Sequence, residues 1–162
     1  MLWYSPDMIF LTRDTALDAP ARSFASLMEL YENNYIYIRR LVPELDHLPG
    51  AAVSRVAGTA DLHLYILERC PYTSTLRLTH RFDGDDEAQL CPDMVVRVYH
   101  DARTAEVLPS AELARFRLWK GGLVPDPRSL EWRWEVNRFL NRWLRYCLGE
   151  GHSFRVTRPI SA

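Results

Sequence analysis

Strict two-residue alternation of apolar and polar side chains runs through the stretch Met94-Val-Val-Arg-Val-Tyr-His-Asp-Ala-Arg-Thr-Ala-Glu-Val107. Such alternation is typical of half-buried β-strands, so it predicts a hairpin made of strands Met94–His100 and Arg103–Leu108. One face of this hairpin is apolar and the other is polar. The stretch therefore predicts an antiparallel sheet with one buried face, and the rest of the chain can be interpreted around that sheet.

The same alternation extends toward the N-terminus. Apolar residues recur at every second position in Asp61–Arg69 and again in Tyr72–Arg81, with a break at Cys70-Pro71. These two segments predict a second hairpin, and Val53–Ala57 predicts a further short strand. Four or five antiparallel strands joined by short turns form a meander, one face of which needs a cover.

Two amphipathic helices are predicted to provide that cover. Apolar residues recur at spacings of three and four from Arg22 until Pro43 ends the pattern. A second helix is predicted between an N-cap at Ser129 and a left-handed C-terminal cap at Gly149. The segment Ser110–Trp119 predicts a helical turn followed by an extended part. The predicted fold is α+β: an antiparallel sheet of four to six strands packed against an N-terminal and a C-terminal helix.

Length and composition predict one folded domain. The chain has 162 residues, of which 48% are hydrophobic and 25% charged, as in ordinary globular proteins. We predict an extended N-terminal arm over residues 1–20 and a single α+β domain over residues 21–162. The net charge of −1 excludes a strong basic field over the whole molecule. Three cysteines without a C-x-x-C pair, no signal-peptide pattern and no membrane-spanning apolar run predict a cytoplasmic protein.

The opening hairpin carries the best candidate for a ligand site. The alternation predicts that His100 pairs with Ala105. Tyr99 then faces Glu106, and Arg97 lies diagonally from that carboxylate. An arginine beside a phenol and an acid can bind phosphate, although cross-strand charge pairs also decorate sheets that bind nothing. The ligand-binding candidates are Arg97, Tyr99, His100, Asp101 and Glu106.

A catalytic role for this hairpin is not predicted. His100 and Asp101 are an adjacent imidazole and carboxylate, and such a pair can act as a general base with an orienting acid. Adjacent strand residues point to opposite faces, however, and Asp101 is better suited to start the turn. We therefore assign no catalytic residue.

Metal and nucleotide cofactors are likewise not predicted. The acidic stretch Asp83-Gly-Asp-Asp-Glu87 lacks the later glycine and the closing glutamate of a calcium-binding EF-hand loop. The five histidines show no zinc-binding spacing, and the chain has no P-loop, no dinucleotide fingerprint and no nucleophile elbow. We interpret the acidic stretch as a solvated loop.

The predicted C-terminal helix carries a second candidate surface. Arg138, Arg142 and Arg145 recur at i, i+4 and i+7, which makes one cationic stripe, with Trp134 and Tyr146 predicted to flank it. Arginines interleaved with aromatic rings suit an acidic partner or single-stranded nucleic acid. All but one of the 20 basic residues are arginine, which also fits a GC-rich genome without any functional meaning.

Three segments resemble the YqiB-like family of small bacterial proteins of unknown function. They are the opening hairpin, the string Asn137-Arg-Phe-Leu-Asn-Arg-Trp-Leu-Arg-Tyr-Cys-Leu-Gly149, and Glu29-Leu-Tyr-Glu-Asn-Asn34 followed by Leu41-Val-Pro43. The resemblance covers roughly residues 20–150. It implies a bacterial cytoplasmic protein and carries no established activity that could be transferred to individual residues.

Three functional hypotheses remain open. The first is a noncatalytic regulatory or adaptor module that binds a protein partner through the arginines at 138, 142 and 145. The second is a small enzyme or sensor for a phosphorylated metabolite or nucleotide at the hairpin, with Arg97 holding phosphate and His100 as acid or base. The third is RNA binding through the cationic helix, which would depend steeply on salt. No membrane partner is expected.

Overall fold

The computed structural model of the chain describes residues 23–81, 92–115, 118–119 and 123–155. In chain order these residues form α2 (Phe24–Leu41), β1 (Ala51–Ser54), β2 (Asp61–Arg69), β3 (Thr73–Arg81), β4 (Asp93–Tyr99), β5 (Thr104–Leu108), α3 (Ala111–Arg115) and α4 (Leu130–Gly149). The predicted arm at residues 1–20 and the acidic stretch at residues 83–87 lie outside the described residues.

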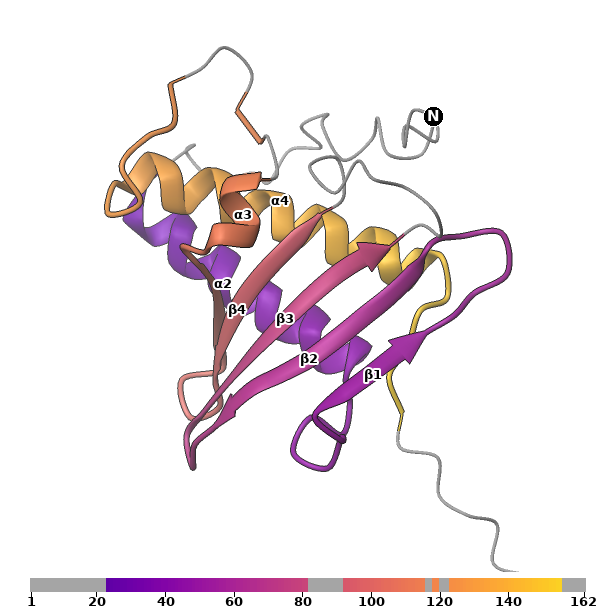
Figure 1. Cartoon of the computed structure of the whole chain (residues 1–162). Helices are drawn as coiled ribbons and strands as arrows, with labels where there is room; N and C mark the ends of the chain where they lie inside the picture. Colours follow the sequence, from indigo (N-terminus) through magenta and orange to yellow (C-terminus); the bar gives the residue numbers. More distant parts are fainter. Residues whose placement is uncertain (1–22, 82–91, 116–117, 120–122, 156–162) are drawn as a thin grey trace, which may run out of the picture.

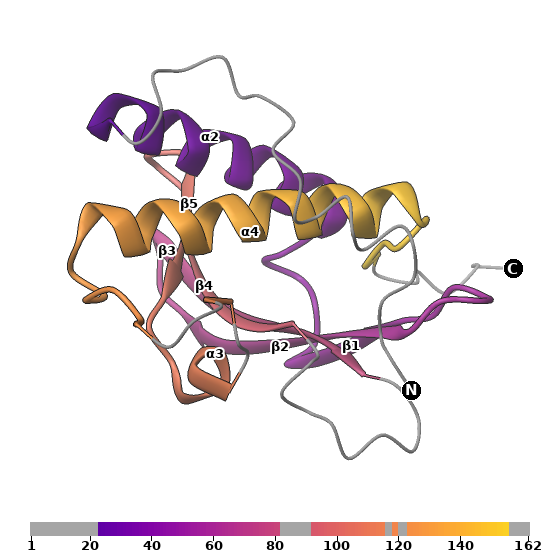
Figure 2. The same ribbon diagram turned by 90° about the horizontal axis from the view of Figure 1, so that it is seen from above.

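The five strands form one antiparallel sheet in the order β1-β2-β3-β4-β5, so each strand pairs with its neighbour along the chain. Helices α2 and α4 lie side by side on one face of this sheet, and α3 lies on the opposite side (Figures 1 and 2). This arrangement confirms the predicted α+β fold, with an antiparallel sheet packed against an N-terminal and a C-terminal helix.

Two-residue alternation sets which side chains enter the core. Leu64 pairs with Leu78 and Leu76 with Val96, and all four side chains lie almost fully buried beneath the helices. Polar residues occupy the alternate positions on the other face. The register of β2 against β3 shifts between Ile66 and Glu68, so the alternation breaks there. Such a bulge changes which face the remaining residues of the strand point to.

Serine caps set the N-termini of both long helices. The Ser23 hydroxyl accepts a hydrogen bond from the Ser26 amide at 3.1 Å, and the Ser129 hydroxyl accepts one from the Trp132 amide at 3.2 Å. The predicted N-cap at Ser129 is therefore confirmed. The predicted C-cap is wrong, because Gly149 is still helical and Gly151, with φ +94°, takes the left-handed conformation instead.

An apolar stripe on α4 packs against the sheet, as predicted from its spacing. This stripe consists of Trp132, Val136, Phe139, Leu140, Trp143, Leu144 and Cys147, all buried in the main core. A second, smaller cluster between α2 and α4 contains Leu27, Leu30, Tyr31 and Trp134. Helix α4 is thus covered on two sides, by the sheet and by α2.

Polar residues also contribute to the interface between α2 and α4. Asn34 donates to the carbonyl of Asn137 at 3.2 Å, and Asn141 donates to the Asn34 side chain at 3.1 Å. The Asn137 side chain accepts from the amide of Val107 at 2.9 Å, which ties α4 to the edge strand β5. Buried amides that are all hydrogen-bonded fix how the two helices pack against each other.

No helix within the described ranges has the length and apolar character needed to cross a membrane.

Candidate functional site

The two strands of the β4–β5 hairpin pair in a different register from the one that the sequence predicts. Tyr99 pairs with Thr104 and Arg97 pairs with Glu106, so the predicted pairing of His100 with Ala105 is wrong by two residues. Four residues from 100 to 103 form the turn, and Arg103 closes it with φ +53°. A non-glycine residue in this left-handed conformation is uncommon and could not be inferred from a pattern of apolar residues.

The corrected register places three of the five candidate ligand residues together, on the side of β4 and β5 that points away from the main core. The Tyr99 hydroxyl donates to a Glu106 carboxylate oxygen at 2.6 Å. Arg97 lies directly across from Glu106, and its Nε donates to the Thr75 hydroxyl at 3.4 Å. Arg97, Tyr99 and Glu106 therefore form one polar cluster, which we call the hairpin cluster.

Tyr31 from α2 also reaches the hairpin cluster. Its side chain is 9% exposed, and its hydroxyl makes no hydrogen bond within the described part of the chain. Burial, and then the negative charge of Glu106, raise the pKa of Tyr31 to about 12. The pKa of Tyr99 is also raised, by burial and by its hydrogen bond to Glu106. Both phenols thus stay protonated at neutral pH. No pattern in the sequence connects Tyr31 with the hairpin.

The other two candidates do not join the cluster. His100 Nε2 lies 2.8 Å from the Ser74 hydroxyl, and Ser74 is buried on the helix-covered side of β3. Asp101 is exposed in the turn. The imidazole is therefore on the opposite face from Arg97, so the two cannot act together on one bound phosphate.

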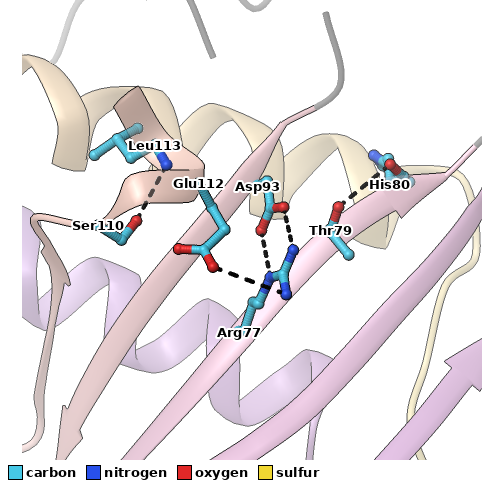
Figure 3. Close-up of polar contacts among 7 residues, drawn as sticks. All are labelled: Arg77, Thr79, His80, Asp93, Ser110, Glu112 and Leu113. Atoms are coloured by element: carbon cyan, nitrogen blue, oxygen red, sulfur yellow. Dashed lines mark hydrogen bonds and ion pairs between the residues drawn. The ribbon is translucent and has the colours of Figure 1, made fainter. Parts of the chain in front are cut away.

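Arg77 lies on the same face of the sheet as Arg97 but in a different environment (Figure 3). Asp93 accepts two hydrogen bonds from its guanidinium, at 2.8 and 2.6 Å, and Glu112 of α3 lies 4.0 Å away. The bonds to Asp93 raise the pKa of Arg77. Ser110 caps α3 by accepting from the Leu113 amide at 3.1 Å, which holds Glu112 over the sheet. Arg77 is a saturated structural group, whereas Arg97 has no carboxylate within 4.0 Å among the described residues.

A pocket of about 570 Å³ lies next to the tip of the same hairpin. Its described lining consists of Glu32, Tyr35, Ile36 and Arg39 from α2, and Ala102 and Arg103 from the turn. No pattern in the sequence predicts this pocket, because its two walls are brought together by the packing of α2 beside β5.

The arginine stripe of α4 lies where the sequence predicts. The outward side of the helix carries Glu131, Glu135, Arg138, Arg142 and Arg145, of which Arg138 and Arg142 are half-buried and Arg145 is exposed. The prediction that aromatic rings flank the stripe is wrong for Trp134, which is 5% exposed and packs against α2. Tyr146 is half-buried and meets the ring of His80 edge-on at 6.2 Å.

A buried polar cluster, which no pattern in the sequence predicts, lies beneath α4. Trp143 Nε1 donates to His80 Nδ1 at 2.9 Å, and the rings of His80 and His152 lie 5.6 Å apart. His152 Nδ1 lies 2.9 Å from the Ser54 hydroxyl. Burial lowers the pKa of His80 to about 3, and burial also lowers the pKa of His152. The cluster lies inside the core, and neither histidine was distinguishable from a surface histidine in the sequence.

Potential metal ligands do not gather anywhere in the described ranges: no group of three or more histidine, cysteine or acidic side chains there is arranged to hold a metal ion.

Comparison with known proteins identifies relatives whose function is unknown. A family model described as "Protein of unknown function (DUF1249)" matches residues 37–153. The chain is 35% identical over 128 residues to the uncharacterized protein YqiB of Escherichia coli strain K12, covering 79% of this chain and 90% of the relative. The YqiB proteins of Escherichia coli O6:H1 and O157:H7 match with the same identity and coverage. No solved structure matches the chain.

Proposed function

The chain belongs to the DUF1249 family of proteins of unknown function, which confirms the resemblance found in its sequence, and from its geometry we propose a noncatalytic cytoplasmic adaptor. In this proposal the chain binds an acidic segment of a protein partner through the arginine stripe of α4. The contact residues are Arg138, Arg142 and Arg145.

One observation carries the proposal: the three arginines lie on a side of α4 that points away from the apolar stripe facing the sheet, with Arg145 exposed and Arg138 and Arg142 half-buried. The side of α4 that faces the sheet carries the apolar stripe described above, which begins at Trp132 and ends at Cys147. The side that faces α2 carries Trp134 and Asn141. The three arginines recur at i, i+4 and i+7, so they follow one line along the side that points away from the apolar stripe. A helix held in place on two sides presents these charges on a rigid scaffold, which lowers the entropy cost of binding.

The charge of the stripe favours an acidic protein segment. Guanidinium groups bind carboxylates through two parallel hydrogen bonds, and such pairs are stronger than neutral hydrogen bonds. Glu131 and Glu135 extend the stripe at its N-terminal end, so its charge changes sign along the helix. This polarity would orient a partner that carries its carboxylates opposite the arginines and a basic group opposite the glutamates.

The same stripe suits RNA less well. Single-stranded nucleic acid binding combines basic groups with exposed rings on which bases stack. Trp134 is buried against α2, and Tyr146 is half-buried beside His80. The two glutamates would also face phosphates.

A hairpin enzyme or phosphate sensor using both Arg97 and His100 is also less well supported, because these two side chains lie on opposite faces of the sheet.

Site-specific photo-crosslinking tests the proposal in living cells. A photoreactive amino acid is placed at Arg145, which is exposed and outward-facing, and a second chain carries it at Arg128 as a control. We expect crosslinks at position 145 to protein segments rich in aspartate and glutamate. Crosslinks to RNA at that position would replace the proposal with RNA binding, and the absence of crosslinks specific to position 145 would overturn it.

Charge reversal provides the matched comparison. The variant R138E/R142E/R145E should lose the crosslinked partner in co-purification. The variant R55E/R128E/R155E, which changes the same amount of charge at three other exposed arginines, should keep it. Because Arg138 and Arg142 are half-buried, R145E alone is included to separate binding from folding. Equal capture by the two triple variants would exclude the stripe as the contact surface.

A further inference from the structure

The pocket beside the hairpin turn has the size of a metabolite site. Its volume of about 570 Å³ lies within the range of roughly 300–1,000 Å³ that is usual for small-molecule pockets. It is separate from the arginine stripe of α4, since its described lining comes from α2 and from the β4–β5 turn.

Helix geometry explains one wall of this pocket. Glu32, Tyr35, Ile36 and Arg39 recur at i, i+3, i+4 and i+7, which places them on one side of α2. The buried face of α2 is a neighbouring stripe that includes Leu30, Asn34, Ile38 and Leu41. The pocket wall is therefore a second stripe, beside the one that packs against the rest of the domain.

Backbone conformation explains the opposite wall. The turn places Ala102 and Arg103 against α2, and Arg103 has φ +53°. Left-handed backbone costs a non-glycine residue about 1–2 kcal/mol, and residues kept in such conformations cluster at binding sites. The chain thus retains an arginine at a position where glycine would be relaxed, and that arginine lines the pocket.

The charged groups of the pocket are available to a ligand. Within the described ranges, Glu32, Arg39 and Arg103 have no opposite charge within 4.0 Å. Arg39 donates one hydrogen bond to the carbonyl of Pro43 at 3.1 Å, which anchors its guanidinium and leaves other N–H groups for a ligand. Two guanidinium groups and one carboxylate give the lining a net positive charge.

An apolar patch completes the site. Ile36 is 44% exposed, and Tyr35 beside it is half-buried. In a concave site, an exposed aliphatic side chain contributes affinity for an apolar ligand group.

We propose that this pocket binds a small anionic metabolite. Arg39 and Arg103 hold its phosphate or carboxylate group, and Tyr35 and Ile36 contact an apolar part of it. Glu32 accepts a hydrogen bond from a hydroxyl or ammonium group of the same ligand. The site stands on the pocket geometry alone and does not depend on the adaptor function.

Titration of the isotope-labelled chain by two-dimensional NMR tests this proposal. The probes are phenyl phosphate, phenylacetate, inorganic phosphate and benzyl alcohol. We expect saturable shifts of the amides of Ile36, Ala102 and Arg103 with at least one of the two aromatic anions. Benzyl alcohol, which lacks the charge, and inorganic phosphate, which lacks the ring, should bind more weakly. A preference for phenyl phosphate or for phenylacetate identifies the anion that the site takes.

Substitutions locate the anion. R103Q keeps the backbone conformation and removes the charge, and it should weaken probe binding about tenfold or more, as the loss of a charge-assisted hydrogen bond does. R39Q should act in the same direction. R40Q is the control on the same helix, because Arg40 stacks over the Tyr37 ring at 5.7 Å and does not line the pocket. The NMR spectrum of each variant reports whether it is folded.

Three results would overturn the proposal. The first is that neither aromatic anion causes saturable changes in the amide chemical shifts. The second is that the changes map to residues away from α2 and the turn. The third is that R39Q and R103Q leave the affinity for the anion unchanged. Inorganic phosphate binding as tightly as phenyl phosphate would contradict the role of Tyr35 and Ile36.

Discussion

Two groups of polar side chains, the cluster beneath α4 and the pocket beside the hairpin turn, use charge and hydrogen bonding in opposite ways. Beneath α4, Trp143 donates a hydrogen bond to His80, and the Ser54 hydroxyl lies within hydrogen-bond distance of His152. These buried polar atoms are therefore paired with each other inside the protein. At the pocket, Arg103 is exposed and has no ion pair within the described ranges.

This difference separates structural polar groups from groups available for recognition. A buried donor and acceptor that are satisfied by each other hold one packing arrangement, and removing either leaves the other unsatisfied at a cost of about 1–3 kcal/mol. An exposed guanidinium adds little to folding but can bind an anion. We therefore expect substitutions beneath α4 to change the free energy of unfolding, and substitutions at the pocket to change ligand binding.

The largest expected effect is at Trp143. Its side chain is 1% exposed and packs in the main core, so W143A should lower the free energy of unfolding by about 3–5 kcal/mol. W143F retains most of the ring volume but leaves His80 Nδ1 without its donor, so it should cost about 1–3 kcal/mol. Urea unfolding followed by circular dichroism measures both values. A cost below 0.5 kcal/mol for W143F, on the order of a neutral surface change, would mean that the hydrogen bond to His80 contributes little.

Acid pH should break the cluster beneath α4 without any substitution. Trp143 donates to His80 Nδ1, so that nitrogen must be unprotonated in the folded protein. Burial lowers the pKa of His80 to about 3, whereas a histidine in the unfolded chain has a pKa of about 6.5. Below pH 6.5 the unfolded state therefore binds more protons than the folded state, and stability falls as pH falls. His80 alone should account for a loss of about 3 kcal/mol between pH 7 and pH 4.

Unfolding measured from pH 8 to pH 4 tests this linkage. His152, whose pKa is also lowered, should add to the loss below pH 6.5. The variant H80Q should show a shallower decrease, since glutamine does not titrate, whereas H47Q, at an exposed histidine in a loop, should follow the wild-type profile. Parallel pH profiles for H80Q and the wild type would contradict a neutral, buried His80.

The sequence predicted the elements of the fold because those elements depend on local patterns. Two-residue alternation located the strands, apolar spacing located the N-terminal helix, and the N-cap at Ser129 located the start of the C-terminal helix. It failed where tertiary packing decides. The hairpin turns over residues 100–103 with Arg103 in the left-handed conformation, and the packing of α2 beside β5 brings Tyr31 to Glu106.

The candidate residues show the same contrast between local patterns, which the sequence reveals, and tertiary packing, which it does not. Strand alternation placed Arg97 and Tyr99 on one face and His100 on the other, as the structure has them. The pocket required knowing that Arg39 and Arg103, which are far apart in the chain, line the same space. Spacing within one element predicts which residues share a face, but it does not predict which face another element meets.

The smallest expected effect is at Arg103 in the pocket. There a substitution should raise the free energy of unfolding, whereas substitutions beneath α4 should lower it. R103G removes left-handed strain of about 1–2 kcal/mol but adds unfolded-chain entropy of roughly 0.5–1 kcal/mol, so the protein should become more stable by up to about 1.5 kcal/mol. The same substitution removes the guanidinium and should weaken binding of the aromatic anion as R103Q does. Urea unfolding and the NMR titration measure the two effects on one sample, with R103Q as the variant whose stability stays near the wild type. Higher stability with weaker binding would mean that Arg103 is kept for its ligand at the expense of folding. Lower stability in R103G would show instead that the Arg103 side chain supports the turn, and the pocket would then belong with the structural polar groups beneath α4.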